Sequence, residues 1–382
     1  MEEIGLYVHI PFCKQKCYYC DFVSFSNKGQ LIEKYVECLI KEIDSYNLEN
    51  YNVTTIYIGG GTPSCIDSKH IKNIIAKIKE KLSTNITKFE EIEITIEINP
   101  GTINIDKLKD YKEIGINRIS IGLQSTNNEI LKQIGRIHNY EQFRETYDLA
   151  KQVGFENINV DLMIGLPEQR IKDLNESLID IIKLEPNHIS VYSLIVEENT
   201  KMEELIDSGE RKLPDEELER QMYWYVKNTL ELNGYNHYEI SNFSKKGKES
   251  KHNINCWKQK QYIGFGVSAH SYLNRIRYSN IENIEKYIDN INENNMEQNK
   301  IIQEEQSLQD EMKEFMMLGF RMLDGVCISD FKEKFIENPI FVYRKELNEL
   351  VEQGLIEIDI NHIRLTSKGL DLANKVFEKF VD

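Results

Sequence analysis

The sequence predicts an α/β fold in which strands and helices alternate over residues 1–200 to form a parallel sheet. Six short runs rich in Ile, Val and Tyr are each bounded by Gly, Pro or Asn, as strands usually are. Amphipathic helical patterns separate these runs, which is the order of βα units in a parallel sheet. Six such units are too few for the eight-stranded barrel, so a partial barrel and an open doubly wound sheet both fit.

The expected strands follow one another along this first part of the chain. They are Gly5–Ile10, Thr54–Gly59, Glu91–Ile98, Arg118–Leu123, Asn157–Met163 and His188–Leu194. The expected helices between them include Gln30–Ser45, Lys69–Leu82, Asn127–Ile134, Tyr140–Val153 and Lys172–Leu184. Parallel strands end at the same edge of a sheet, and functional sites of such folds form at the carboxyl-terminal edge.

The rest of the chain breaks this alternation and divides into three further parts. The expected domains are residues 1–200, 201–280, 281–300 and 301–382. The second is predicted to be an α+β segment that covers the barrel, with a helix over Pro214–Asn233 and then a polar, aromatic-rich stretch with few helical signals. The third is polar and rich in Asn, which predicts a linker with one marginal helix.

The last part predicts a small domain of helices and one hairpin. Helical patterns cover Glu311–Leu323 and Val342–Gln353, and "GLIEIDINHIRLTSKGL" reads as a hairpin before a final helix. Helices that lead into a short hairpin are typical of a winged-helix-like domain. Because the segment is not basic, we expect a docking or lid role rather than DNA binding.

Composition narrows the class of protein. A net charge of −16 argues against a general nucleic-acid binder, because no basic surface would neutralise phosphates. The sequence contains no run of about 18 apolar residues, so no membrane span is predicted. The acidic start "MEEIGLYVHI" does not resemble a signal peptide. We therefore expect a cytoplasmic protein whose scattered cysteines, Cys38, Cys65, Cys256 and Cys327, are free thiols.

Three further cysteines lie within eight residues, in "HIPFCKQKCYYC". Cys13, Cys17 and Cys20 follow the first strand, and the proline after that strand places them in a loop. Ordinary iron–sulfur clusters use four thiolates, so three thiolates on a four-iron cluster would leave one iron free for another ligand. The alternative is a zinc site completed by His9 or Cys38, since zinc also favours clustered thiolates.

A run of glycines ends the second strand, in "YIGGGTPS" at Tyr57–Ser64. Three consecutive glycines leave backbone N–H and C=O groups bare, so a charged small molecule can approach them closely. A glycine run alone is more often just a turn. Here adjacent strands place the glycine run and the cysteine loop on one edge of the sheet, which favours a shared binding site.

The combination of CxxxCxxC and GGGTP resembles the radical S-adenosylmethionine (SAM) enzymes. Within them the chain is similar to the oxygen-independent coproporphyrinogen III oxidase family and its haem-chaperone relatives. The similarity runs from Gly5 to about Tyr272, through "LYVHIPFC", "GGGTPS", "IEINPG", "RISIGLQS", "IGRIHN", "NVDLMIGLP", "HISVYSL" and "GFGVSAHS", and is weaker in the last hundred residues. It implies that the first domain is a partial (β/α)6 TIM-like barrel of the radical SAM type.

The resemblance also implies a site. The three clustered cysteines would hold three irons of a [4Fe–4S] cluster, and the fourth iron would chelate the amine and carboxylate of SAM. One electron from the cluster would cleave the sulfonium to methionine and a 5′-deoxyadenosyl radical. The matching SAM-contact positions are Tyr7, Gly60, Gly61, Thr62, Glu97, Gln124, Arg136 and Asp161.

The charged members of this set suit different parts of SAM. Arg136 suits the carboxylate, because a guanidinium pairs with a carboxylate bidentately. Glu97 and Asp161 suit the ribose hydroxyls or the amine. Each of them, taken singly, also fits a solvated strand end or a surface ion pair.

Two departures from the oxidase pattern point to the haem-chaperone branch. Oxidases carry a further cysteine where this chain has Phe22, and they have a long N-terminal extension, whereas Tyr7 lies almost at the start here. The chaperone branch has an HNxxYW signature for haem, and this chain has "HNINCW" with Cys in place of Tyr. The implied haem contacts are His252, Cys256 and Trp257, in a segment expected to be accessible. The alternative for His252 is a surface histidine in a polar loop.

The expected function is that of a radical SAM [4Fe–4S] protein acting as a haem chaperone. It would bind haem as cargo and pass it to a haem-requiring acceptor protein, which could be membrane-associated, with flavodoxin or ferredoxin as electron donor. A homodimer is compatible with this role, and no nucleic-acid partner is expected. The alternatives are an oxygen-independent coproporphyrinogen III oxidase of porphyrin metabolism and a non-catalytic structural metal-binding protein.

Overall fold

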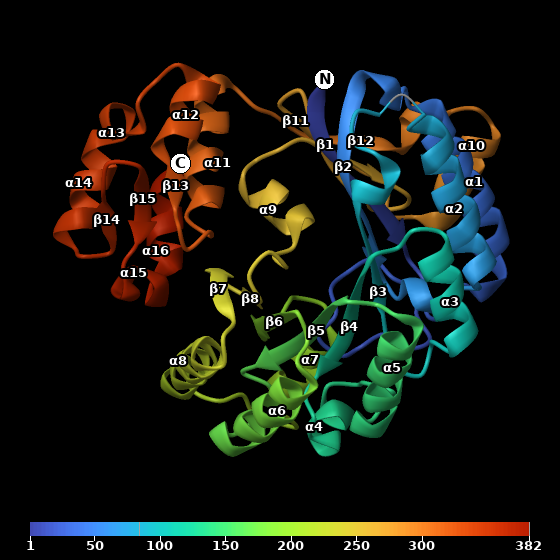
Figure 1. Cartoon of the computed structure of the whole chain (residues 1–382), viewed down its shortest axis with the longest axis horizontal. Coiled ribbons are helices and arrows are strands. Elements are labelled where there is room, and N and C mark those ends of the chain that lie inside the picture. The colour runs from blue at the N-terminus through green and yellow to red at the C-terminus, as the bar shows by residue number, and fades with distance from the viewer. Residues whose placement is uncertain (84, 382) are drawn as a thin grey trace.

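A computed structural model describes residues 1–83 and 85–381 of the chain. Its largest feature is a curved sheet in the order β12-β11-β10-β9-β1-β2-β3-β4-β5-β6-β8-β7 (Figure 1). The strands of this sheet are β1 (Glu2–Ile10), β2 (Tyr51–Gly60), β3 (Glu93–Ile98), β4 (Arg118–Gln124), β5 (Asn157–Ile164), β6 (His188–Ser193), β7 (Asn236–Glu239), β8 (Asn242–Ser244), β9 (Tyr262–Phe265), β10 (His270–Leu273), β11 (Ile276–Asn280) and β12 (Lys300–Glu305).

Helices join the parallel strands and lie on the outside of the curve (Figure 1). Strands β1 to β6 pair in parallel in chain order, so each connection crosses over through at least one helix. These helices are α1 (Ile32–Ser45), α2 (Ser68–Lys81), α3 (Ile105–Glu113), α4 (Asn128–Gln133), α5 (Tyr140–Val153) and α6 (Ile171–Leu184). The predicted partial (β/α)6 barrel is therefore confirmed, with strand ends shifted by a few residues.

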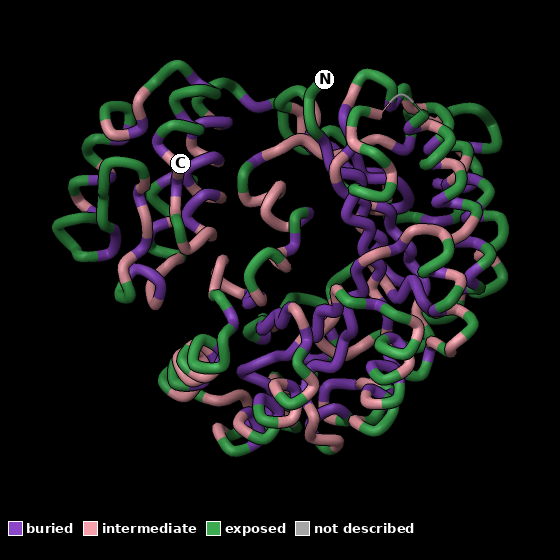
Figure 2. Tube along the Cα trace, viewed as in Figure 1, coloured by how far each residue is buried: buried purple, intermediate pink, exposed green. Residues whose placement is uncertain are grey.

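The two faces of the sheet differ in chemistry because side chains alternate along a strand. Ile56 and Ile58 of β2 are fully buried in the main hydrophobic core, whereas Tyr57 between them lines a cavity on the concave face. Glu97 of β3 and Asp161 of β5 line the same cavity. Figure 2 shows the buried residues concentrated in the strands and on the inner faces of the helices. The strands therefore bury apolar side chains in the core on one face and direct polar side chains into the cavity on the concave face.

The segment after β6 adds strands to both edges of the sheet. Part of it also lies in the hollow of the sheet, the space enclosed by its concave face (Figure 1). It contains α7 (Lys201–Asp207), α8 (Glu216–Leu232) and α9 (Lys251–Trp257). Strands β8 and β7 add to β6 in antiparallel fashion, and β9 returns to pair in parallel with β1. Helix α9 lies in the hollow of the sheet (Figure 1). The sequence carried few helical signals there, because α9 has only seven residues, of which His252 alone is buried.

The linker expected over residues 281–300 is wrong, although the one helix expected there is present. They contain α10 (Ile284–Asn292), which packs beside α1 and belongs to the main core. The helix buries Ile284, Tyr287, Ile288 and Ile291, which share one face at helical spacing. The high Asn content concealed this apolar stripe.

The C-terminal domain has its own hydrophobic core and a short sheet in the order β13-β15-β14. Its strands are β13 (Val326–Cys327), β14 (Ile356–Ile358) and β15 (His362–Leu365). Its helices are α11 (Leu308–Gly319), α12 (Ile328–Phe335), α13 (Pro339–Val342), α14 (Arg344–Glu352), α15 (Ser367–Asp371) and α16 (Ala373–Phe377). The expected hairpin is present as β14 and β15, which pair antiparallel.

Several contacts join this domain to the middle segment, including the backbone hydrogen bond from Ile240 to the Arg321 carbonyl and two that involve tryptophan. The guanidinium of Arg321 lies 4.2 Å from the ring centre of Trp257 at the end of α9, and Trp224 of α8 donates its indole N–H to Asp371 at 3.1 Å. In the described residues, no helix is both long enough and apolar enough to cross a membrane.

Candidate functional site

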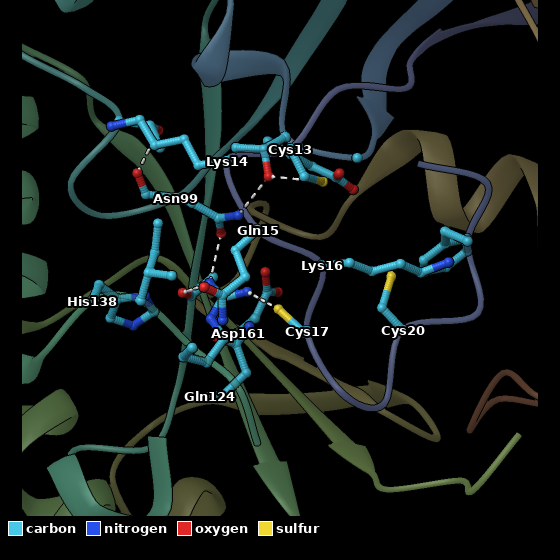
Figure 3. A pocket seen from close by; sticks show the side chains of 18 of the residues that line it. Cys13, Lys14, Gln15, Lys16, Cys17, Cys20, Asn99, Gln124, His138 and Asp161 are labelled. Carbon is cyan, nitrogen blue, oxygen red and sulfur yellow. Dashed lines mark hydrogen bonds between the residues drawn. The ribbon is translucent and has the colours of Figure 1, made fainter. Parts of the chain in front are cut away.

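A cavity of about 410 Å³ opens at the carboxyl-terminal edge of the parallel strands. The cysteine loop, the glycine run and the ends of β3 to β6 all contribute to its wall (Figure 3). The predicted site residues that line it are Cys13, Cys17, Cys20, Gly60, Gly61, Thr62, Glu97, Gln124, Arg136 and Asp161. The fold therefore brings together nearly the whole cluster and SAM set that the resemblance implies.

The cysteine loop is closed at its base by backbone hydrogen bonds. The Cys13 N–H donates to the Phe25 carbonyl at 3.0 Å, and the Phe25 N–H donates to the Pro11 carbonyl at 2.7 Å. His9 adds a side-chain tie, because its Nε2 lies 2.9 Å from the Val23 carbonyl. These contacts tie both ends of the loop, near Cys13 and near Phe25, to each other and to the end of β1. The three thiols are thereby held at the cavity.

Burial favours the protonated form of two of the three thiols. It raises the pKa of Cys13, and it raises the pKa of Cys20 to about 11. Both groups therefore keep their protons at neutral pH until a metal takes the place of the proton. In the described residues no group of three or more His, Cys, Asp and Glu side chains is arranged to hold a single metal ion.

The glycine run packs directly against the cysteine loop. The Gly61 N–H donates to the Ile10 carbonyl at 2.9 Å, and the Thr62 N–H donates to the Phe12 carbonyl at 2.8 Å. A Cβ on Gly61 would lie 2.8 Å from that same Phe12 oxygen and 3.0 Å from Cys13 Sγ. Only glycine permits this close approach of the two loops.

Arg136 is half-buried and its guanidinium contacts three different groups in the cavity wall. Its Nη1 donates to Cys17 Sγ at 3.3 Å, and its Nη2 donates to Asn99 Oδ1 and to the Gly122 carbonyl, both at 2.7 Å. Its Nε is buried without a partner. One N–H of a fixed cation thus remains available for an anionic ligand.

Gln124 offers a matching acceptor at the end of β4. Its side-chain oxygen is buried and has no partner, and the residue has a φ of 69°. A non-glycine residue in this left-handed region is uncommon and is often found at binding sites. The unsatisfied amide oxygen fits a donor on a bound molecule.

Two carboxylates face the cavity from β3 and β5. Burial raises the pKa of Glu97 to about 7, while hydrogen bonds from the Tyr57 hydroxyl and the Gly60 N–H and the charge of Arg118 oppose the rise. Burial also raises the pKa of Asp161, against hydrogen bonds from neighbouring polar side chains. Both groups can therefore accept hydrogen bonds from a ligand and respond to its charge.

Tyr7 lies behind the cavity wall. Its hydroxyl is 3.0 Å from His9 Nδ1, and its ring stacks on Tyr57 with centres 6.3 Å apart. Burial lowers the pKa of His9 to about 4, so the imidazole is neutral and its Nδ1 can accept from the Tyr7 hydroxyl. Tyr7 therefore supports the cysteine loop through His9, and the lining residues do not include it.

The haem candidates lie on a short helix, α9, and not in a loop. The expected accessibility is wrong for His252, whereas Cys256 and Trp257 are partly exposed. His252 is 8% exposed, and its Nδ1 lies 2.9 Å from the Thr55 hydroxyl. Glu93 accepts the His252 N–H at 3.1 Å, which anchors the start of α9 inside the hollow. Burial lowers the pKa of His252 to about 4 and raises the pKa of Cys256 to about 11.

The sequence reasoning missed Asn99, which also lines the cavity. Its side chain bonds both Thr62 and Arg136. A signal was present, because Asn99 stands directly after β3 in "EINPG", at the edge where sites form. The motif was noted as part of the resemblance, but the residue itself was not considered.

Comparison with known proteins first gives the class. Residues 7–181 match the Radical SAM superfamily, and residues 306–372 match the HemN C-terminal domain. The solved structure of Escherichia coli coproporphyrinogen III oxidase (HemN), a radical SAM enzyme, has a TM-score of 0.85 at 22% identity over 99% of this chain and 90% of its own. That likeness shows the fold. The chain is a radical SAM protein with a HemN-type C-terminal domain.

Full-length relatives then give the family. The heme chaperone HemW of Lactococcus lactis is 38% identical over 98% of this chain and 96% of its own length. The heme chaperone HemW of Bacillus subtilis is 37% identical over 98% of each chain, and that of Escherichia coli is 32% identical over 100% and 99%. This chain belongs to the heme chaperone HemW family.

Membership of the radical SAM superfamily implies SAM and a [4Fe–4S] cluster, and the residues present fit both. Three free thiols face one cavity, and two of them already accept hydrogen bonds from Thr62 and Arg136. The unpartnered Arg136 Nε and Gln124 Oε1 supply one donor and one acceptor for a zwitterionic ligand.

Proposed function

We propose that this protein is a haem chaperone that binds haem and transfers it to a haem-requiring acceptor protein. The observation that carries the proposal is the full-length identity of 32–38% to proteins named heme chaperone HemW. Phe22 supports it over the oxidase alternative. This exposed side chain lines the cavity where the oxidase pattern has a further cysteine.

Within this proposal the cavity holds the cluster and SAM. Cys13, Cys17 and Cys20 bind the cluster, Arg136 binds the SAM carboxylate, and Glu97 accepts from the amine or the ribose. When bound, the reduced cluster supplies one electron for cleavage of the SAM sulfonium. Haem transfer itself needs SAM as a bound ligand and need not consume it in every cycle.

His252, Cys256 and Trp257 are the proposed haem contacts. With Nδ1 of His252 engaged by Thr55, Nε2 is the nitrogen left for iron, which is how a hydrogen-bonded partner commonly orients a ligating imidazole. The lowered pKa keeps the ring neutral, as ligation requires. Because His252 is buried, α9 has to move before the ring can reach a cargo as large as haem.

The setting proposed for this activity is the cytoplasm. There a small electron carrier such as flavodoxin or ferredoxin would reduce the cluster, and the acceptor would be a haem protein that could be associated with the membrane. The free cysteines are compatible with a reducing compartment.

The proposed function predicts haem binding without oxidase activity. Anaerobically reconstituted protein should shift the Soret band of haem at a defined stoichiometry and should form no protoporphyrinogen from coproporphyrinogen with SAM and a reductant. Absorption titration and product chromatography measure the two outcomes. Multiple turnovers of decarboxylation would overturn the chaperone proposal in favour of the oxidase.

Variants of α9 locate the haem contact. His252→Ala should weaken haem binding, and Cys256→Ala should alter the spectrum if the thiol contacts the cargo. Thr55→Val is the matched control, because it keeps the imidazole and removes only the hydroxyl that orients it. Unchanged haem binding in the His252→Ala/Cys256→Ala double variant would move the haem site away from α9.

The pKa of Glu97 predicts how SAM binding depends on pH. A carboxylate accepts hydrogen bonds from SAM and a protonated carboxyl does so poorly, so affinity should fall as pH drops below about 7. Glu97→Gln should remove this part of the pH dependence, leaving that of SAM itself. Equilibrium dialysis of parent and variant between about pH 6 and about pH 8 tests the difference, which spans the titration. Parallel curves would show that Glu97 does not touch SAM.

A further inference from the structure

A continuous chain of hydrogen bonds joins two of the three clustered thiols. Thr62 Oγ1 donates to Cys13 Sγ at 3.6 Å, and Asn99 Nδ2 donates to Thr62 Oγ1 at 2.8 Å. Arg136 Nη2 donates to Asn99 Oδ1 at 2.7 Å, and Arg136 Nη1 donates to Cys17 Sγ at 3.3 Å. Figure 3 shows these contacts as dashed lines on both sides of Asn99, leading to Cys13 and Cys17.

The direction of every bond in this chain is set by donor and acceptor chemistry. A guanidinium can only donate, so Asn99 must turn its oxygen toward Arg136 and its NH₂ toward Thr62. The Thr62 oxygen then accepts from Asn99, and its single proton is directed to Cys13 Sγ. One amide in the middle thus places a donor on each of two thiols.

Packing leaves this amide little freedom. A Cβ on Gly122 would lie 2.7 Å from Asn99 Oδ1 and 3.1 Å from Arg136 Nη2. The Asn99 N–H also donates to the Ser64 hydroxyl at 3.1 Å, which holds its backbone beside the glycine run. Asn99 and Arg136 are therefore held in place by packing against Gly122 in the wall of the cavity.

We infer that Asn99 is a positioning residue that sets the reduction potential of the cluster by holding hydrogen-bond donors on the Cys13 and Cys17 thiolates. The inference rests on the proposed function, because it requires the cluster on these cysteines. Hydrogen bonds to cluster sulfurs are among the factors that set the potential, since they stabilise the more negative, reduced state. Asn99 acts through Thr62 and Arg136 and need not touch the cluster.

The same chain links SAM to the cluster. The Arg136 guanidinium that donates to Cys17 is also the group proposed to bind the SAM carboxylate. Its Nη2 is held by Asn99 and Gly122, which leaves Nε for the ligand. Asn99 therefore keeps one cation in a position to serve both a thiolate and SAM.

An aspartate in place of Asn99 would have nearly the same shape but would reverse the direction of the hydrogen bond with Thr62. An ionised Asp can accept from Arg136 but cannot donate to Thr62. The Thr62 hydroxyl would then donate to the carboxylate, and Cys13 would lose the hydrogen bond from Thr62. Asn99→Asp therefore tests the direction of the bonds while preserving the size of the side chain.

The experiment measures the midpoint potential of the reconstituted cluster by redox titration followed by electron paramagnetic resonance. Asn99→Asp should retain iron and sulfide at the parent level and should shift the potential to a more negative value. Asn104→Asp is the matched charge control, because Asn104 lies at the start of α3, on the segment that follows β3, outside the hydrogen-bond chain. Its shift should be clearly smaller.

A double variant separates the hydrogen bond from the added charge. Thr62→Val removes the hydroxyl, so in that background Asn99→Asp can no longer divert a proton from Cys13. The shift caused by Asn99→Asp should therefore shrink when Thr62 is Val. Thr62→Ser keeps the hydroxyl, so in that background Asn99→Asp should shift the midpoint potential by the full amount. An equal Asn99→Asp shift in both backgrounds would overturn the inference, as would a shift no larger than that of Asn104→Asp. Failure of the parent itself to assemble a cluster would instead refute the cluster assignment in the proposed function.

Discussion

Replacing Cys13, Cys17 or Cys20 by Ala is expected to abolish the iron–sulfur cluster. Each thiolate is proposed to hold one iron, and the loop that carries them is closed by the bond between the Cys13 N–H and the Phe25 carbonyl. Loss of one thiolate therefore leaves one iron of the cluster without its protein ligand. Parent protein reconstituted without oxygen should hold about four irons per chain, as a [4Fe–4S] cluster requires. Iron and sulfide analysis, with the visible absorption of the cluster, measures the loss.

Cys65 supplies the matched control for these variants. It lies beside the same loop, where its thiol donates to the Phe12 carbonyl at 3.4 Å, yet it is outside the clustered set. Cys65→Ala, Cys38→Ala and Cys327→Ala should keep the cluster. Stoichiometric zinc without iron in the parent would contradict the assignment and favour the structural-metal alternative.

Removing the Arg136 guanidinium should weaken SAM binding strongly while the cluster persists. Arg136→Met keeps much of the side-chain volume and loses a charge-assisted hydrogen bond to the SAM carboxylate, a loss of about 1.5–3 kcal/mol. That corresponds to a fall in affinity of about 10-fold to 150-fold. Isothermal titration of the reconstituted protein with SAM measures it, and iron analysis of the same sample checks that the cluster is intact.

Arg144 provides a comparison at a site that does not contact the cavity. It lies on α5 and pairs with Asp148 on the outer surface, so Arg144→Met should bind SAM like the parent. If Arg136→Met also binds SAM like the parent, Arg136 serves only Cys17 and Asn99. The SAM carboxylate would then have to be bound by other groups.

The sequence was sufficient for the parts of this protein whose signals are local. Ile and Val runs bounded by Gly, Pro and Asn marked β1 to β6, because a strand buried on a helix-covered face needs apolar side chains at alternate positions. The cysteine and glycine motifs stand directly after β1 and at the end of β2. Their meeting at one edge follows from parallel strand order alone.

The proposed SAM positions lie on a strand, at its end or directly after it, except Arg136, which follows α4. Arg136, after α4, and Asp161, on β5, are separated in sequence, but parallel pairing places both beside the same cavity. Here a family pattern supplied the residues and the fold supplied the reason for their proximity. The stripe on α10 was predictable in principle, because Ile284, Tyr287, Ile288 and Ile291 have helical spacing.

By itself, then, the sequence determined the alternating framework, the three thiols and the edge of the sheet where they lie, because these depend on residue type and chain order. The tertiary structure alone decided which side chains bond one another across that framework. Asn99 reaches Arg136 over 37 residues, and His252 reaches Thr55 over 197. Such contacts depend on distances of about 3 Å between elements far apart in the chain, and no local pattern encodes them. For the same reason only the fold revealed that α9 lies inside the curve of the sheet, where burial and the nearby charge of Arg118 keep His252 neutral.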